Sequence, residues 1–261
     1  MFSKKVIYIF LLSLFFLSFS ANSADLNEIL KSGEVKIAVP ESFAPFGSVG
    51  KSGEHEGYDV DVAKLIAKDL GVKLKIVPVV SKQRIPFLET DKVDLVISTM
   101  GANPSRAKSI NFSSAYAPFY SGVFAPSSIK LSTYSDLEGL TIGVTGGTLE
   151  DLELTKRAPK GAKITRFGDN AATLSAIKSK QVQVLVAGNT VAASVTEANP
   201  DFDLERKFII KDSPCFIGIK KGNEDLLRWV NVFILHKKLG GGLNKISQKW
   251  LGQDLPALPS L

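Results

Sequence analysis

The stretch "FLETDKVDLVIST", residues 87–99, runs from an expected short helix through a polar turn into an apolar strand that ends in small hydroxyl residues. The strand is apolar enough to be buried on both faces of a sheet. The stretch "AIKSKQVQVLVAG", residues 176–188, has the same order of helix, polar turn and Val-rich strand. Two copies of one pattern predict two α/β lobes of related design.

Strands and helices alternate around the first copy. The sequence predicts strands at 34–40 and 72–79, a short helix at 84–90, and a helix over 59–71 that begins at Asp59 as N-cap and stops at Gly71. The region from 140 to 188 repeats the order with a strand at 140–147, a helix at 147–158 and a strand at 162–167. This order predicts a mostly parallel sheet flanked by helices in each lobe.

The chain is expected to cross between the lobes twice, at "YAPFYSGVF" (116–124) and "SPCFIGIKK" (213–221). Lobe 1 would then comprise residues 25–117 and be completed by 216–261, and lobe 2 would comprise 118–215. Two extended crossings side by side would form a two-strand hinge.

The first 24 residues differ in kind from the rest. Lys4 and Lys5 precede an apolar run from Val6 to Leu17 and the small-residue segment "SANSA". The run is shorter than the ~20 residues that a bilayer requires, so we expect residues 1–24 to be a cleavable signal peptide of an exported, periplasmic protein, and not a membrane anchor. No cysteine lies near the junction, so no lipid anchor is expected.

Charge and cysteine content argue against a nucleic-acid-binding protein and against a disulfide-stabilised one. The formal charge is +6, and without the two signal lysines 30 basic and 26 acidic residues leave +4, scattered along the chain. This distribution does not favour nucleic-acid binding. Cys215 is the only cysteine. An intramolecular disulfide is therefore impossible, and we expect Cys215 to be a small buried residue.

Four glycine- and hydroxyl-rich loops follow expected strands, at 40–46, 98–106, 145–151 and 187–193. Ligands of parallel sheets bind beyond the carboxyl ends of the strands, where free N–H groups and helix N-termini suit an anion such as a carboxylate. Arg106 could complete such a site with a bidentate guanidinium, or it could pair with a surface acid.

Catalytic and metal motifs are weak. His55 and His236 lie far apart without HxxH spacing, so no metal site and no cofactor is expected. Glu150 and Asp151 precede a helix, where acids commonly complement the dipole. The loop "TGGT" lacks the lysine of a phosphate-binding P-loop.

Six segments, in order, resemble one family. They are "FAPF", "EGYDVDVAKLIAKDLGV", "RIPFLETDKVDLVISTM", "NPSRAKSINFSSAY", "LEGLTIGVTGGT" and "ISQKWLG". From Glu34 to Trp250 the chain resembles the extracellular solute-binding proteins, family 3, which serve ABC transporters of polar amino acids. The resemblance implies a two-lobed periplasmic binding protein fold of type II, a non-enzymatic monomer, a small-molecule ligand and an inner-membrane ABC permease as partner.

The resemblance also implies a set of ligand contacts. Phe43 matches the aromatic residue that covers the ligand, and Arg106 matches the arginine that clamps its carboxylate. Thr148 and Leu149 match the helix N-terminus that closes on that carboxylate, and Arg84 resembles an arginine of members that bind acidic amino acids. The remaining expected contacts are Ser81, where other members often carry a large aromatic residue, with Ser98, Thr99, Met100, Gly101 and Asn189.

Two positions depart from the family pattern. The family usually has Ser or Thr at Gly101 and Asp at Gly188, which together hold the ligand's α-ammonium group. Loss of such a charge-assisted hydrogen bond would weaken binding of an ordinary amino acid by roughly tenfold to more than a hundredfold. Glu150 or Asp151 could replace the acid, Asn189 could make a neutral contact, or the ligand could be a carboxylate without an α-amino group.

The leading expectation is a capture protein for a polar amino acid or related small carboxylate. An enzyme on the same scaffold, a prephenate or arogenate dehydratase, is the alternative, and it would need Glu150 or Asp151 as a general acid.

Overall fold

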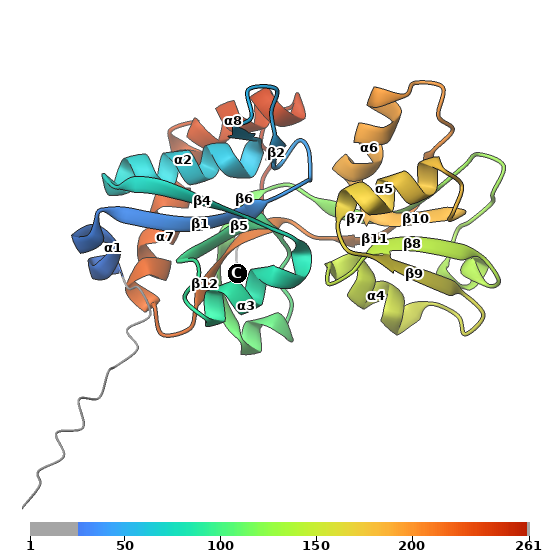
Figure 1. Cartoon of the computed structure of the whole chain (residues 1–261), viewed down its shortest axis with the longest axis horizontal. Helices are drawn as coiled ribbons and strands as arrows, with labels where there is room; N and C mark the ends of the chain where they lie inside the picture. The colour runs from blue at the N-terminus through green and yellow to red at the C-terminus, as the bar shows by residue number, and fades with distance from the viewer. Residues whose placement is uncertain (1–25, 260–261) are drawn as a thin grey trace, which may run out of the picture.

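Two five-stranded sheets, each covered by helices on both faces, form the two lobes of the protein (Figure 1). The computed structural model describes residues 26–259, so the predicted signal peptide lies outside the described residues. Within that range no helix combines the length and apolar character needed to cross a membrane.

The first sheet has the order β4-β1-β5-β12-β6. Its strands are β1 (Glu34–Pro40), β4 (Lys73–Val79), β5 (Leu95–Met100), β6 (Ile110–Ala117) and β12 (Cys215–Lys220). Its helices are α1 (Leu26–Ser32), α2 (Tyr58–Leu70), α3 (Arg84–Glu89), α7 (Glu224–Leu239) and α8 (Gly242–Leu251), with 3₁₀ turns η1 (Ser81–Gln83) and η2 (Arg106–Lys108). A small hairpin joins β2 (Ser48–Val49) to β3 (His55–Glu56).

The second sheet has the order β11-β7-β10-β8-β9. Its strands are β7 (Tyr120–Ala125), β8 (Thr141–Thr145), β9 (Lys163–Phe167), β10 (Val184–Gly188) and β11 (Glu205–Asp212). Its helices are α4 (Leu149–Arg157), α5 (Asn170–Lys178) and α6 (Asn189–Ala198), with the 3₁₀ turn η3 (Tyr134–Leu137).

Both sheets are mixed, so the prediction of mostly parallel sheets was wrong in this detail. In the first sheet β1 pairs in parallel with β4 and β5, but β12 pairs antiparallel with β5 and β6. In the second, β8 pairs in parallel with β9 and β10, but β7 pairs antiparallel with β10 and β11. The parallel strands are those joined through helices, whereas the antiparallel ones carry the chain out to the second lobe and back.

Alternating side chains of the central strands divide the core of the first lobe into two layers. Val35, Ile37 and Val39 of β1 pack in the cluster that includes α2, α7 and α8, whereas Ala38 packs with Leu88 of α3. This is the two-residue period of a strand buried on both faces.

The chain passes between the sheets at Pro118–Phe119, between β6 and β7, and at Ser213–Pro214, between β11 and β12. The N–H of Ser213 donates to the carbonyl of Phe119 at 2.9 Å, so the two crossings lie side by side. Cys215 is buried in β12 of the first sheet. The lobe boundaries drawn from the sequence stay a prediction.

Asp59 does not cap α2, contrary to the prediction. Gly57 is the N-cap, and Asp59 is fully buried in the first turn of the helix. Its Oδ2 accepts from the N–H of Thr99 at 2.9 Å and its Oδ1 from the hydroxyl of Tyr116 at 2.6 Å. Burial raises the pKa of Asp59 to about 7, although these two hydrogen bonds oppose the shift.

The raised pKa predicts a pH-dependent stability. The folded state binds one proton more than the unfolded state between about pH 4 and 7, so the unfolding free energy falls as pH rises, by about 1.4 kcal/mol per unit from this group. Asp59→Asn should remove this component from urea unfolding measured between pH 4 and 8. Asp225→Asn, at an exposed acid of α7, should keep the wild-type slope. An unchanged slope in Asp59→Asn would contradict the assignment.

Candidate functional site

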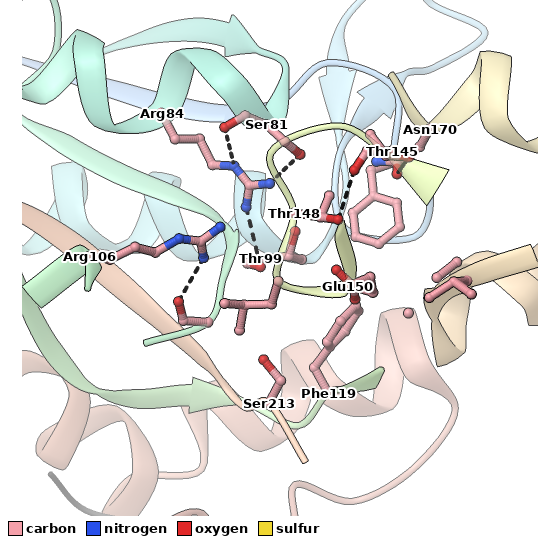
Figure 2. A pocket seen from close by; sticks show the side chains of 16 residues that line it. Ser81, Arg84, Thr99, Arg106, Phe119, Thr145, Thr148, Glu150, Asn170 and Ser213 are labelled. Carbon is pink, nitrogen blue, oxygen red and sulfur yellow. Dashed lines mark hydrogen bonds between the residues drawn. The ribbon is translucent and has the colours of Figure 1, made fainter. Parts of the chain in front are cut away.

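A small cavity lies between the lobes at the carboxyl ends of the parallel strands, as expected for such sheets. Figure 2 shows Arg84 and Arg106 on one side of it and Thr145, Thr148 and Glu150 on the other. The cavity volume is about 30 Å³, room for little more than one or two waters. Its lining, here called the cleft lining, is Phe43, Ser81, Arg84, Thr99, Gly101, Arg106, Phe119, Thr145, Thr148, Leu149, Glu150, Asn170, Val186, Ala187, Gly188 and Ser213.

Arg84 begins α3 and is only 6% exposed. Its Nη1 donates to the carbonyl of Ser98 at 2.7 Å and to that of Thr99 at 3.5 Å. Its Nε donates to the carbonyl of Ser81 at 3.3 Å, and its Nη2 donates to the hydroxyl of the same serine. The side chain is therefore held in place by the backbone around the ends of β4 and β5.

Arg106 begins η2 and is 9% exposed. Its Nη1 donates to the carbonyl of Gly101 and its Nη2 to that of Gly147, both at 2.9 Å. Gly101 follows β5 of the first lobe and Gly147 follows β8 of the second, so this guanidinium bridges the lobes.

The two arginines share the cavity with one acid, Glu150, but form no ion pair with it. Burial, and then the charge of Arg106, lower the pKa of Arg84 to about 10, and burial also lowers the pKa of Arg106. The ion pairs recorded for residues 26–259 include neither arginine. Two buried positive charges thus face one cavity with only hydrogen bonds to neutral groups.

The second lobe contributes the start of α4. Thr148 caps this helix, because its Oγ1 accepts from the N–H of Asp151 at 3.2 Å and donates to the carbonyl of Thr145 at 2.8 Å. Leu149 and Glu150 follow in the first turn, both buried. Glu150 is 6% exposed, and its Oε1 accepts from the hydroxyl of Ser121 at 2.7 Å.

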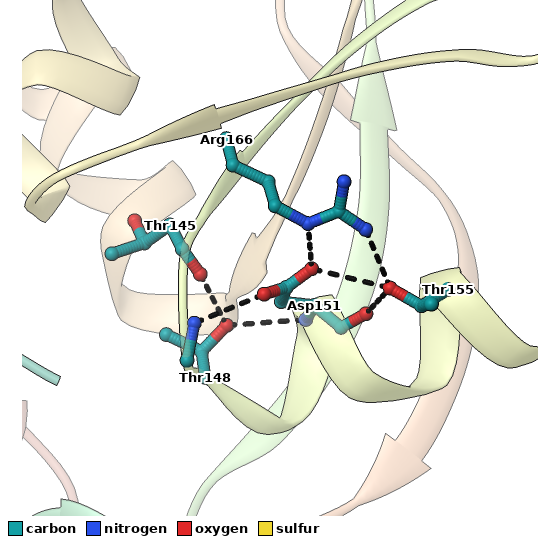
Figure 3. Close-up of polar contacts among 6 residues, drawn as sticks. Thr145, Thr148, Asp151, Thr155 and Arg166 are labelled. Carbon is teal, nitrogen blue, oxygen red and sulfur yellow. Dashed lines mark hydrogen bonds and ion pairs between the residues drawn. The ribbon is translucent and has the colours of Figure 1, made fainter. Parts of the chain in front are cut away.

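Asp151 is turned away from the cleft lining. Its Oδ2 accepts from the N–H of Gly147 at 3.0 Å and its Oδ1 from Nε of Arg166 at 2.7 Å (Figure 3). Of the two acids considered from the sequence, only Glu150 lines the cavity. No group of three or more His, Cys, Asp or Glu within residues 26–259 is placed to hold a metal ion.

The first lobe brings Phe43, Ser81 and Thr99 to the cleft lining. The ring of Phe43 stacks on Phe46 at 5.6 Å between centroids. Thr99 has a φ of 44°, a left-handed conformation that is strained for a β-branched residue. The hydrogen bond from its N–H to buried Asp59 holds this conformation.

Three expected contacts lie elsewhere. Ser98 is buried and lines an adjoining pocket with Phe43 and Arg84, and its carbonyl accepts from Arg84. The side chain of Met100 is 1% exposed and packs in the core. Asn189 accepts from the N–H of Tyr120 at 3.2 Å and lines a separate groove, with Pro45 and Trp250, on the other side of Phe119.

The glycines that depart from the family pattern have the space of a side chain filled by other residues. A Cβ at Gly188 would overlap the ring of Phe119, and a Cβ at Gly101 would overlap Leu149 and the hydroxyl of Ser213. Sequence reasoning missed Phe119 and Ser213, on the two crossings, and also Asn170 and Val186 of the second lobe. The aromatic residues of "YAPFY" were visible in the sequence, but nothing there indicated which one points inward.

Comparison with known proteins agrees with this geometry. Residues 35–253 match the family described as bacterial extracellular solute-binding proteins, family 3. The chain belongs to this family. The ABC transporter glutamine-binding protein GlnH of Bacillus subtilis (strain 168) is 30% identical over 207 residues, covering 78% of this chain and 75% of the relative. The L-cystine-binding protein TcyJ of Escherichia coli (strain K12) is 25% identical over 239 residues, covering 90% of this chain and 89% of the relative.

One solved structure extends the comparison. The ancestral amino acid-binding protein AncCDT-1, described as a precursor of cyclohexadienyl dehydratase, has a TM-score of 0.80 at 30% identity and covers 86% of this chain and 98% of that one. These similarities confirm the predicted family and the two-lobed α/β fold. They place the chain among solute-binding proteins whose named ligands differ.

The packing of Phe119 on Gly188 predicts strong coupling between the two positions. Gly188→Ala should lower the unfolding free energy by about 1–3 kcal/mol, because its Cβ would overlap a ring that Phe43 and Phe46 hold in place. In a Phe119→Ala background, Gly188→Ala should lower the unfolding free energy far less. Gly168→Ala adds a Cβ with no heavy atom within 4 Å. Its unfolding free energy should stay within about 0.5 kcal/mol of the wild-type value. Additive costs at positions 188 and 119 in denaturant unfolding would contradict the coupling.

Proposed function

We propose that the protein is the periplasmic solute-binding component of an ABC importer, which captures a polar amino acid or related small carboxylate between its lobes and delivers it to an inner-membrane permease. Family membership supports the general role. The observation that carries the ligand class is the pair of buried arginines, Arg84 and Arg106, that line one cavity with a single acid, Glu150, and form no ion pair with it.

A carboxylate suits this site for electrostatic reasons. A buried charge is costly unless a counter-ion compensates it. Each guanidinium has five N–H donors, and the hydrogen bonds within the protein use only some of them. The cap of α4 adds the partial positive charge of a helix N-terminus from the opposite lobe. A bound carboxylate would meet donors from both lobes.

Binding would also favour closure of the two lobes. The cavity is too small to admit a solute from outside as it stands, so the ligand would enter while the lobes are farther apart. Contacts that require both lobes at once are the differential interaction that shifts a protein towards its closed state. Arg106 already makes one such contact through Gly147.

Removal of Arg106 tests the proposal. Purified protein should gain thermal stability with one or a few amino acids or organic acids, and Arg106→Ala should weaken their binding by about tenfold to more than a hundredfold, because a charge-assisted contact is lost. Arg166→Ala, at an arginine that pairs with Asp151 outside the cleft lining, should bind like the wild type. Equal affinity in Arg106→Ala and wild type in titration calorimetry would rule out the clamp.

The dehydratase alternative has one supporting feature besides the similarity to AncCDT-1. Glu150 is an acid in the cleft lining and could serve as a proton donor. Incubation of the protein with prephenate, with detection of phenylpyruvate, separates the two functions. A capture protein forms no product, whereas an enzyme forms it in proportion to its concentration and loses this activity in Glu150→Gln.

A further inference from the structure

We infer that the cleft selects small carboxylates that carry no α-ammonium group, and that Phe119 sets this selectivity by filling the wall beside Gly188. The inference rests on the proposed function, because it specifies which carboxylates the arginines receive. Its three supports are the charge balance of the cleft lining, the backbone carbonyls that the arginines already occupy, and the space behind two glycines.

The cleft lining has an excess of positive charge. It contains two guanidinium groups, Arg84 and Arg106, and a single acid, Glu150. Outside the lining, exposed Lys82 lies beside the arginines, and Glu41 and Asp169 lie in an adjoining pocket that also contains Arg84. Asp59, whose pKa burial raises to about 7, lies behind Thr99. A ligand with one negative charge neutralises the lining, whereas a zwitterion leaves one buried positive charge uncompensated.

An α-ammonium group would find few acceptors. Such a group carries three N–H donors and needs oxygen partners. The carbonyls nearest the arginines, those of Ser98, Gly101 and Gly147, already accept from a guanidinium. An ammonium group placed on the same oxygens would lie next to a like charge. Glu150 is the one carboxylate of the lining, and its Oε2 is the acceptor that such a group would have to use, because Oε1 accepts from Ser121.

The space behind both glycines is filled by neighbouring side chains. Any side chain at Gly188 would overlap Phe119, and any at Gly101 would overlap Leu149 and Ser213. Phe119 is held by edge contacts to Phe43 and Phe46, with centroids 6.1 and 5.9 Å away. The wall at Gly188 is therefore apolar, which suits the carbon skeleton of an organic acid.

Matched ligand pairs test the inference directly. Calorimetry of the wild type would compare alanine with pyruvate and propionate, glutamate with 2-oxoglutarate and glutarate, and phenylalanine with phenylpyruvate. Within whichever of these three ligand groups binds, the acids without an amino group should bind at least tenfold more tightly than the α-amino acid. Equal or tighter binding of the α-amino acid overturns the selectivity while leaving the proposed function intact. Absence of binding by every carboxylate overturns both.

A paired substitution should invert the preference. Phe119→Ala combined with Gly188→Asp replaces the apolar wall with a carboxylate, so affinity for the α-amino member should rise at least tenfold over Phe119→Ala alone. The matched control is Phe119→Ala with Gly168→Asp, because residue 168 lies outside the cleft lining; it should not gain this affinity. An unchanged ligand ratio in the folded double variant contradicts the role of Phe119. If that variant fails to fold, the wild-type comparison decides.

Discussion

Two positive charges buried around one cavity, with a single acid among its lining residues, are the constraint on which the interlobe site depends. Arg84 and Arg106 are each more than nine-tenths buried, and both donate to backbone carbonyls, not to carboxylates. Neutral acceptors stabilise a guanidinium less than a carboxylate does. The arrangement is therefore held by the fold around it, and the proposed anionic ligand would complete it.

The fold supplies that support through the ends of its parallel strands. The carbonyls of Ser98, Thr99 and Gly101, at the end of β5, bind the arginines. Thr99 turns into a left-handed conformation to do so, and buried Asp59 accepts its N–H. The second lobe adds Gly147 and the capped start of α4. A chain of hydrogen bonds thus links the core of the first lobe to the opposite wall of the cleft.

Much of this could be predicted from sequence, for identifiable reasons. The repeated helix–turn–strand pattern gave the α/β lobes because burial of both sheet faces imposes long-range regularity. The loops after β5 and β8 were found because strand ends and glycines mark them in any such sheet. Membership of the solute-binding family was also recognisable, since its six segments are spread along the chain.

The rest depends on side-chain direction, which local sequence does not specify. Asp59 looked like a helix cap, but the turn at Gly57 starts the helix earlier and sends the carboxylate into the core. Asn189 follows a strand that lines the cleft, yet its side chain faces the groove beyond Phe119. Phe119 itself points inward, where its ring packs edge-on against Phe43 and Phe46. The missing side chains at Gly101 and Gly188 could be seen, but what fills their place could not.

A crystal structure of the protein with its tightest-binding carboxylate is the most direct measurement of the account. We predict that the ligand's carboxylate lies within hydrogen-bonding distance of the guanidinium groups of both Arg84 and Arg106, with Phe119 still packed on Gly188. A carboxylate bound away from both arginines would contradict the central claim. An ammonium group lodged beside Gly188, with Phe119 turned out, would keep the clamp and contradict the selectivity.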